Sequence, residues 1–388
     1  MNPTSISRAL LSPFRTAIPR RPGAAPHLRV LSLLLLGTGL ILQQSQGADP
    51  LAASARWVPT ASMSITRSIH TATLLPSGKV LVAGGLSTSM VAATAELYNP
   101  ATGTWEATGS MSIPRAGHHA FLLDDRRVFV IGGATDQRTT EFYDPNTGVW
   151  TPGPSLLRKR LEFTATLLIN GKILVAGGDN ANGQIGDCEL YDPATNAWQL
   201  TGALNFRRAS ATATLLDDGR VLITGGQNGS DHTLVSAEVY DPASGTWTVT
   251  GSMNKARSSQ VAVLLQTGEV LVAGGGAGGG TKLTELYDPT TGTWMLTGNS
   301  NVTFVQPTIT LLGNGNALVA GGYGGDPVYR GSSLYDPASG TWVPSARVLG
   351  THGSGATATL LANGKVLLLG GMDENFMPTA DADLYQSR

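Results

Sequence analysis

Arginines recur along this chain at a nearly constant interval, each three residues before a short segment of small and β-branched residues. The five are Arg67, Arg115, Arg160, Arg208 and Arg257. A guanidinium group carries five donors in a planar fork that matches a carboxylate or a phosphate. If these side chains come together in the fold, the chemistry they offer is the binding of an anionic ligand such as a carboxylate.

An acidic residue recurs with the same period and offers the arginines a different partner. It stands two residues before a tyrosine in six units, as Glu96, Glu141, Glu189, Glu238, Glu285 and Asp383. In the sixth unit Phe304 takes the arginine place and Ser333 the acid place, so both charges vanish together, as expected of buried ion pairs. The seventh unit keeps its acid but has Gly353 at the arginine place, with Arg347 or His352 as the substitute. Ion pairs within the units and a ligand-facing ring of arginines are both open readings.

Residues that break the repeat are better candidates for specificity than residues that obey it. Phe304 and Gln306 add an aromatic ring and an amide where the arginine pattern fails. The most variable segments follow each Gly-Gly pair, and two of them contain His232 and Tyr323. Loops on a rigid scaffold often carry binding surfaces. We therefore predict that ligand contacts come from the five arginines together with Phe304, Gln306, His232 and Tyr323.

Metal and thiol chemistry find little support in the sequence. His70, His118, His119 and His352 stand near the starts of repeated segments, and we expect hydrogen-bonded structural roles for them rather than a metal site. The single cysteine, Cys188, excludes an intrachain disulfide and any multi-cysteine metal site. We predict no metal, no cofactor and no identifiable catalytic residue.

Aromatic pairs seven residues apart indicate the strands that must position these residues. The pairs are Tyr98/Trp105, Tyr143/Trp150, Tyr191/Trp198, Tyr240/Trp247, Tyr287/Trp294 and Tyr335/Trp342. Gly-Gly pairs follow apolar runs at intervals of 45 to 49 residues, from 84–85 to 370–371. A period of this length with four apolar segments per unit is typical of a propeller blade. Because the glycines and aromatics recur in nearly every unit, we assign them to packing.

The order of Gly-Gly, then Tyr-Asp-Pro, then Gly-Thr-Trp resembles the kelch repeat, and the resemblance covers about residues 56–388. It implies an all-β fold, a seven-bladed propeller of four-stranded antiparallel sheets. Tyr385 has no tryptophan after it, and Trp57 has no tyrosine before it. We therefore predict that residues 56–62 supply the outer strand of the last blade and close the ring, which removes free sheet edges.

The first 47 residues differ from the rest of the chain. They carry five arginines and no acid, followed by the apolar run VLSLLLLGTGLIL at 30–42, which is typical of a secretory signal. An uncleaved N-terminal anchor is the alternative. We predict a signal or anchor at 1–47 and a propeller at 48–388 that is secreted, periplasmic or on the cell surface. Beyond residue 47 the chain has 21 basic and 27 acidic residues, which gives no electrostatic reason to bind nucleic acid.

Some exported kelch propellers are enzymes, so two classes of function are open. Copper oxidases of the galactose oxidase type need a Cys–Tyr crosslink and extra domains, which this chain does not match. Sialic acid mutarotases are similar in size, but no specific residues can be matched to them. The leading prediction is a monomeric binding module for a protein or glycan ligand. The alternative is a carbohydrate-active enzyme of mutarotase or lyase type.

Overall fold

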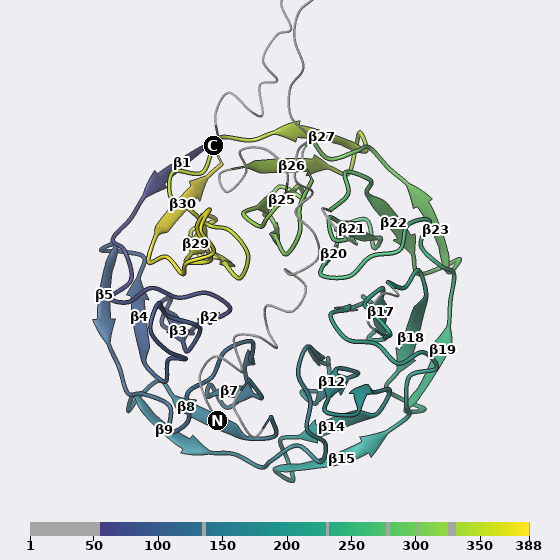
Figure 1. Cartoon of the computed structure of the whole chain (residues 1–388), viewed down its shortest axis with the longest axis horizontal. Coiled ribbons are helices and arrows are strands. Elements are labelled where there is room, and N and C mark those ends of the chain that lie inside the picture. The colour runs from purple at the N-terminus through teal and green to yellow at the C-terminus, as the bar shows by residue number, and fades with distance from the viewer. Residues whose placement is uncertain are drawn as a thin grey trace, which may run out of the picture.

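The computed structural model describes residues 55–133, 137–229, 233–276, 280–301, 303–324 and 331–387. Within these ranges the chain forms seven four-stranded antiparallel sheets arranged as blades around a central axis (Figure 1). The predicted fold class is confirmed: the protein is a seven-bladed β-propeller. The predicted signal or anchor segment at 1–47, and His232, lie outside the described residues.

Each of the first four blades runs from its innermost to its outermost strand in chain order. The strands are β2 (Thr71–Leu74), β3 (Val80–Ala83), β4 (Ala95–Asn99) and β5 (Thr104–Ala107) in blade 1; β6 (His119–Leu122), β7 (Val128–Ile131), β8 (Thr140–Asp144) and β9 (Val149–Pro152) in blade 2; β10 (Thr164–Leu167), β11 (Ile173–Ala176), β14 (Cys188–Asp192) and β15 (Ala197–Thr201) in blade 3; and β16 (Thr212–Leu215), β17 (Val221–Thr224), β18 (Ala237–Asp241) and β19 (Thr246–Val249) in blade 4.

The remaining blades follow the same order, with one exception at the end of the ring. The strands are β20 (Val261–Leu264), β21 (Val270–Ala273), β22 (Glu285–Asp288) and β23 (Thr293–Leu296) in blade 5; β24 (Thr308–Leu311), β25 (Ala317–Ala320), β26 (Ser332–Asp336) and β27 (Thr341–Pro344) in blade 6; and β28 (Thr357–Leu360), β29 (Val366–Leu369), β30 (Ala382–Gln386) and β1 (Arg56–Pro59) in blade 7. A small hairpin, β12 (Asp179–Asn180) with β13 (Gly183–Gln184), extends from blade 3.

Blade 7 is assembled from both ends of the described chain, as the orphan aromatics predicted. The purple strand β1 lies beside the yellow strand β30 in Figure 1, and their register places Trp57 opposite Tyr385. The two rings lie 5.2 Å apart at 57°, close to the geometry of the complete pairs such as Tyr98 and Trp105 at 5.1 Å and 53°. The N-terminal strand therefore restores the seventh aromatic pair and closes the ring.

The hydrophobic core is divided among the interfaces between blades. One cluster joins Phe129 and Ile131 of blade 2 to Ile173 and Tyr191 of blade 3, and equivalent clusters lie at the other six interfaces of the described ring. Broad aromatic side chains suit the wedge of space that opens between twisted sheets. The tyrosines also bond across the interface, since Tyr240 Oη lies 2.7 Å from Thr201 Oγ1 of the preceding blade. The packing role predicted for these residues is confirmed.

The Gly-Gly pairs allow the backbones of neighbouring blades to touch. The Gly226 N–H donates to the Arg257 carbonyl of the next blade at 2.8 Å. A Cβ on Gly225 would lie 2.6 Å from that same carbonyl oxygen. Gly225 also has a φ of 61°, in the left-handed region that other residues rarely adopt. Close approach and backbone conformation together account for glycine here.

The loops that precede the inner strands and those that follow the Gly-Gly pairs lie at the same end of the propeller. Bridges between Ser68 and Leu86, and between Val305 and Tyr323, pair the two kinds of loop directly. We call this end the channel mouth. The opposite end carries the tight turns between the first and second strands, such as the one at 76–78.

Candidate binding site at the channel mouth

The five repeated arginines lie inside the blades, each in an ion pair with the repeated acid. In blade 4, Arg208 Nη2 donates to Glu238 Oε1 at 2.9 Å, and neither side chain is measurably exposed. The equivalent pairs are Arg67–Glu96, Arg115–Glu141, Arg160–Glu189 and Arg257–Glu285. Burial lowers the pKa of the Arg208 guanidinium, and the charge of Glu238 opposes that shift. The prediction of structural pairs within the units is confirmed.

Each pair also binds the backbone around it. Arg208 Nη1 donates to the Gly225 carbonyl at 2.7 Å, which holds the end of the second strand. The Glu238 carboxylate accepts the backbone N–H groups of Asn205 and Phe206 at 2.7 and 3.0 Å, which holds the loop before the inner strand. These guanidinium groups are therefore engaged within the blade, and ligand contact by the five arginines stays a prediction that this geometry does not favour.

Blades 6 and 7 depart from the ion pair in different ways. Phe304 is 1% exposed and packs in the core between blades 5 and 6, so it does not supply the aromatic surface predicted for the mouth. In blade 7 the Gly322 N–H donates to the His352 carbonyl, as Gly226 does to Arg257. His352, one of the two substitutes expected from the sequence, thus takes the arginine place, with its Nε2 3.3 Å from Asp383 Oδ2. The sequence assignment of Gly353 to that place is wrong because blade 7 has one extra residue before its inner strand.

Just before each inner strand, one residue adopts a left-handed backbone conformation. These seven residues, which we call the mouth ring, are Ile69, Gly117, Glu162, Ser210, Ser259, Gln306 and Gly355, with φ between 47° and 77°. This conformation lets main-chain groups bond sideways from blade to blade. The Ser210 N–H donates to the Glu162 carbonyl at 2.9 Å, and the Ser259 N–H donates to the Ser210 carbonyl at 3.0 Å. The Ile69 N–H donates to the Gly355 carbonyl at 2.7 Å across the ring closure.

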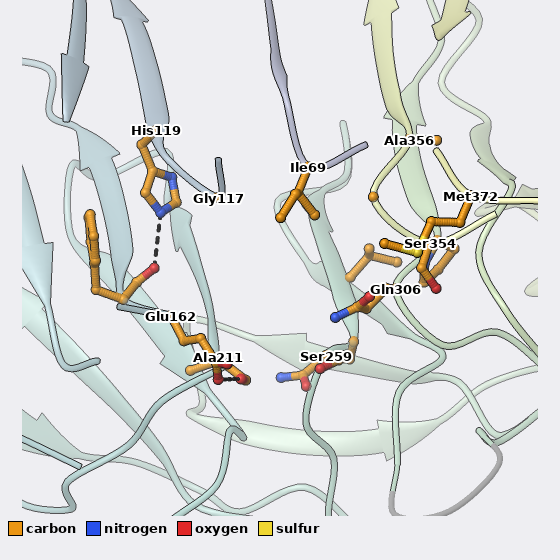
Figure 2. Close-up of a pocket in the computed structure, with 16 residues that line it drawn as sticks. Ile69, Gly117, His119, Glu162, Ala211, Ser259, Gln306, Ser354, Ala356 and Met372 are labelled. Atoms are coloured by element: carbon orange, nitrogen blue, oxygen red, sulfur yellow. Dashed lines mark hydrogen bonds between the residues drawn. The ribbon is translucent and has the colours of Figure 1, made fainter. Parts of the chain in front are cut away.

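The mouth ring surrounds a cavity of about 330 Å³. All seven ring residues line it, together with neighbours that include His119, Phe163, Gln260 and Met372. Figure 2 shows Glu162, Ser259 and Gln306 arranged around the same space as Ile69 and Met372. The volume lies at the lower end of the range typical of small-molecule pockets. A monosaccharide or a single side chain of a partner is of suitable size.

The two sides of the cavity differ in chemistry. Blades 3 to 6 contribute Glu162, Ser210, Ser259 and Gln306, which we call the polar arc. Blades 7, 1 and 2 contribute only glycine and isoleucine to the mouth ring, with Ala356 and Met372 beside them and with Ser354 and His119 as the polar residues of that side. Such a surface suits a ligand with one polar and one apolar face.

Glu162 is the one charged side chain among the residues described as lining the cavity. Burial raises the pKa of its carboxyl group, the hydrogen bond from Ser210 opposes that shift, and the charge of Asp179 adds to it. The Ser210 hydroxyl donates to Glu162 Oε2. On the neighbouring wall, His119 Nε2 lies 3.0 Å from the Phe163 carbonyl, and burial lowers the pKa of this imidazole. His119 is therefore neutral, with its proton on Nε2.

Gln260 lines the same cavity and has an acceptor buried within the blade. Its side chain is 4% exposed, and its Nε2 donates to the Thr224 carbonyl at 2.8 Å. That bond fixes the orientation of the amide, so Oε1 is the other terminal atom. Gln260 Oε1 is buried and has no hydrogen-bond partner within the described structure.

Of the other predicted site residues, Gln306 lines the cavity. Tyr323 lies outside the cavity but is 37% exposed, and its ring lies 5.5 Å from that of Phe376. Sequence reasoning missed Glu162, Ser210 and Ser259. A signal for them was present, because the position two residues after each repeated arginine is Ile, Gly, Glu, Ser and Ser in turn. That variation within a regular motif marks a position that packing does not dictate.

The described residues offer neither a cluster of metal ligands nor an exposed thiol. No three His, Cys, Asp or Glu side chains among them come together in a way that could hold a metal ion. Cys188 is fully buried in strand β14, and burial raises the pKa of its thiol to about 11. These residues do not fit a copper centre that requires a reactive cysteine. None of the described segments is an apolar helix of membrane-spanning length.

The chain resembles known proteins in both sequence and fold. Residues 69–275 match the domain described as the KLHDC2/KLHL20/DRC7 Kelch-repeats domain. No curated protein matches the chain in sequence. Among solved structures, the chain is similar to a novel fungal alcohol oxidase of the AA5 family in complex with copper, with a TM-score of 0.72 and 20% identity over 86% of this chain and 76% of that one. It is also similar to YjhT, with a TM-score of 0.57 and 15% identity over 74% of this chain and 99% of that one.

Proposed function

We propose, from the premise that this chain belongs to the kelch-repeat family, that it is a binding module for a protein or glycan ligand. Fold alone does not decide function, because function lies in the site that a fold carries. The observation that supports the proposal is the cavity of about 330 Å³ framed by the mouth ring. Its walls include positions that differ from blade to blade, on a scaffold whose repeated residues are engaged in packing.

The backbone at the mouth supports a binding role. Ile69 and Glu162 hold φ values of 47° and 51°, which are unfavourable for residues other than glycine. Strained positions persist where the surrounding structure imposes them, and they occur often at ligand sites. Here the hydrogen bonds between blades impose the strain and present each side chain at the cavity.

A screen of the purified protein against glycans and peptides tests the proposal, with two variants for comparison. Ser259→Trp fills the mouth without removing any hydrogen bond of the Ser259 side chain that the structure shows. Ser77→Trp is the matched control, because Ser77 is an exposed residue of a turn at the opposite end of the channel. We expect Ser259→Trp to abolish binding of the hits and Ser77→Trp to retain it. Equal binding by both variants would place the ligand elsewhere and refute the proposal.

One observation favours the carbohydrate-active enzyme as a second candidate. Glu162 is a cavity carboxyl whose pKa is raised by burial, and groups shifted in this way often serve in acid and base catalysis. Following each sugar hit by proton NMR would detect interconversion or cleavage. Turnover that Glu162→Gln abolishes would support the enzyme and reject the binding-only proposal.

Export and oligomeric state complete the proposal. We infer that residues 1–47 direct the propeller out of the cytoplasm and that it acts as a monomer. The basic and apolar character of that segment supports the first inference, and the outer strands of the described blades, which are only four or five residues long, support the second. N-terminal sequencing of the protein from cell fractions and light scattering of the purified protein test the two in turn.

A further inference from the structure

The polar arc places its negative charge at Glu162. The Ser210 hydroxyl uses its proton on Glu162, which leaves its oxygen lone pairs available beside the carboxylate. Ser259 and Gln306 can both donate and accept, so they do not exclude a donor-rich ligand. A carboxylate with an acceptor beside it selects a ligand group that carries N–H or O–H donors.

The charge of Glu162 has no counterion within the described residues. Its hydrogen-bond partner is the Ser210 hydroxyl, and the charge that acts on it is the negative Asp179. Asp179 Oδ1 is itself buried without a hydrogen-bond partner. The buried arginine of the same blade, Arg160, is engaged with Glu189 at 2.7 Å. A cation entering the mouth would therefore meet a carboxylate that no side chain has neutralised.

The amide of Gln260 is held by the blade rather than open to a ligand. Its Nε2 donates to the Thr224 carbonyl, and its Oε1 has almost no accessible surface. A ligand in the cavity would reach Oε1 only after neighbouring atoms move. Glu162, which lines the cavity and is only half-buried, is the acceptor open to it.

The facing wall suits the carbon skeleton of such a molecule. Ile69, Ala356 and Met372 line the cavity from blades 1 and 7, and Figure 2 shows all three across the space from Glu162. These side chains offer apolar contact but no charge. An anionic ligand would meet Glu162 and no cation among the described lining residues.

We propose that the channel mouth binds a protonated amine, with the ammonium group at Glu162 and the apolar face of the ligand against Ile69 and Met372. This inference rests on the proposed binding function and names the ligand class for it. The chemistry could come from an amino sugar of a glycan or from an amino group of a peptide. The net acidic composition beyond residue 47 favours the approach of a cation to the mouth.

The test compares each amine with its acetylated form, which lacks the positive charge and carries an added acetyl group; the Glu162→Gln variant below separates the effect of charge from that of size. Glucosamine oligosaccharides are titrated against their N-acetylated counterparts, and a lysine-containing peptide is titrated against its acetyl-lysine form, each by isothermal calorimetry at pH 7. Acetylation removes the positive charge and should weaken binding by at least about tenfold, because hydrogen bonds to charged groups contribute about 1.5–3 kcal/mol. Whichever pair shows binding and this loss identifies the source of the amine.

Two matched variants assign the effect to the mouth. Glu162→Gln keeps the size of the side chain and an acceptor for Ser210, but it removes the charge and should weaken amine binding by about tenfold or more. Glu106→Gln is the control, because Glu106 lies 47% exposed on outer strand β5 in a pair with Lys79, and it should bind as the wild type does. Melting curves of both variants show that each is folded.

The outcomes separate this inference from the proposed function. Equal binding of amine and acetylated ligands, unchanged binding by Glu162→Gln, or no binding of either amine to the wild-type protein would overturn the amine proposal. If acetylated ligands bind and Ser259→Trp abolishes their binding, the mouth is a binding site for a neutral ligand and only this inference fails. If Ser259→Trp has no effect on any ligand that binds, the proposed function fails as well.

Discussion

The buried ion pairs make a quantitative prediction, because blade 6 shows how the propeller is built without one. In blade 5, Arg257 and Glu285 are both fully buried and are joined by a 2.9 Å bond. At the same places blade 6 has Phe304 and Ser333, buried at 1% exposure each. Transplanting the blade 6 residues into blade 5 gives two single variants, Arg257→Phe and Glu285→Ser, and the double variant.

The magnitude follows from the contacts that each change removes. Arg257→Phe leaves Glu285 buried without its counterion and removes the donor to the Gly274 carbonyl at 2.9 Å. Losing one partner of a buried pair typically lowers stability by about 3–5 kcal/mol. With an unfolding entropy of ~2.1 cal/mol/K per residue over roughly 330 residues, 4 kcal/mol corresponds to about a 6 °C fall in melting temperature. Glu285→Ser should lower stability similarly, since it strands Arg257 and the Asn254 N–H that bonds the carboxylate at 2.6 Å.

The double variant separates an ion pair from two independent contacts. It leaves no unpaired charge, so we expect its loss of stability to be smaller than the sum of the two single losses by about 2 kcal/mol, a coupling typical of residues in one network. Thermal and urea unfolding of all four proteins measure this cycle. Additive losses within about 0.5 kcal/mol would refute the account of these residues as paired charges.

Three further predictions follow from the scaffold. Deleting residues 48–62 removes β1 and Trp57, opens the ring at blade 7 and should strongly lower the melting temperature; unchanged melting would contradict closure by the N-terminal strand. Burial, with the charge of Arg67, lowers the pKa of His70 to about 3 from 6.5. Between these pH values the unfolded chain binds a proton at His70 and the folded chain does not, so stability falls as pH drops from about 6.5 toward 3. His70→Gln should flatten that fall in a pH series of melting curves, and an unaltered slope would exclude His70 as its source. Gly225→Ala places Cβ 2.6 Å from a neighbouring carbonyl oxygen and should lower the free energy of unfolding by at least about 2 kcal/mol. In Gly78→Ala the Cβ meets no atom within 4 Å, so the loss should be only the ~1 kcal/mol of a left-handed alanine. Equal losses in urea unfolding would rule out the contact between blades as the reason for glycine at 225.

The fold was predictable because its determinants repeat. The distance from Tyr98 to Trp105 recurs in each complete unit, and the register of the sheets places every such pair on opposite strands, as in Tyr98 with Trp105 and Trp57 with Tyr385. The one-residue insertion in blade 7 was not predictable in the same way. Counting along the chain assigned Gly353 to the arginine place, and only the contact between Gly322 and His352 reveals the shift.

The candidate site was predictable only in part, because sequence reports the type of a side chain better than its direction. The arginines have the right chemistry for a ligand, but the partner acids that turn them into the blade lie 26 to 30 residues away in the chain. The residue two positions later was not singled out in blades 3 to 5, although Gln306 was in blade 6. The left-handed conformation of this residue depends on hydrogen bonds between blades, and the local sequence around Ile, Glu or Ser does not predict that conformation.

That conformation also bears on why the mouth carries the residues it does. A position with φ near 50° is filled most easily by glycine, as Gly117 and Gly355 show. Ile69, Glu162 and Gln306 occupy equivalent places at a cost of roughly 1–2 kcal/mol each. Ile69 packs against a small apolar cluster that contains Met372, and Glu162 accepts a hydrogen bond from Ser210 of the next blade. These contacts offset part of the strain, and all three side chains line the cavity, where a ligand would meet them.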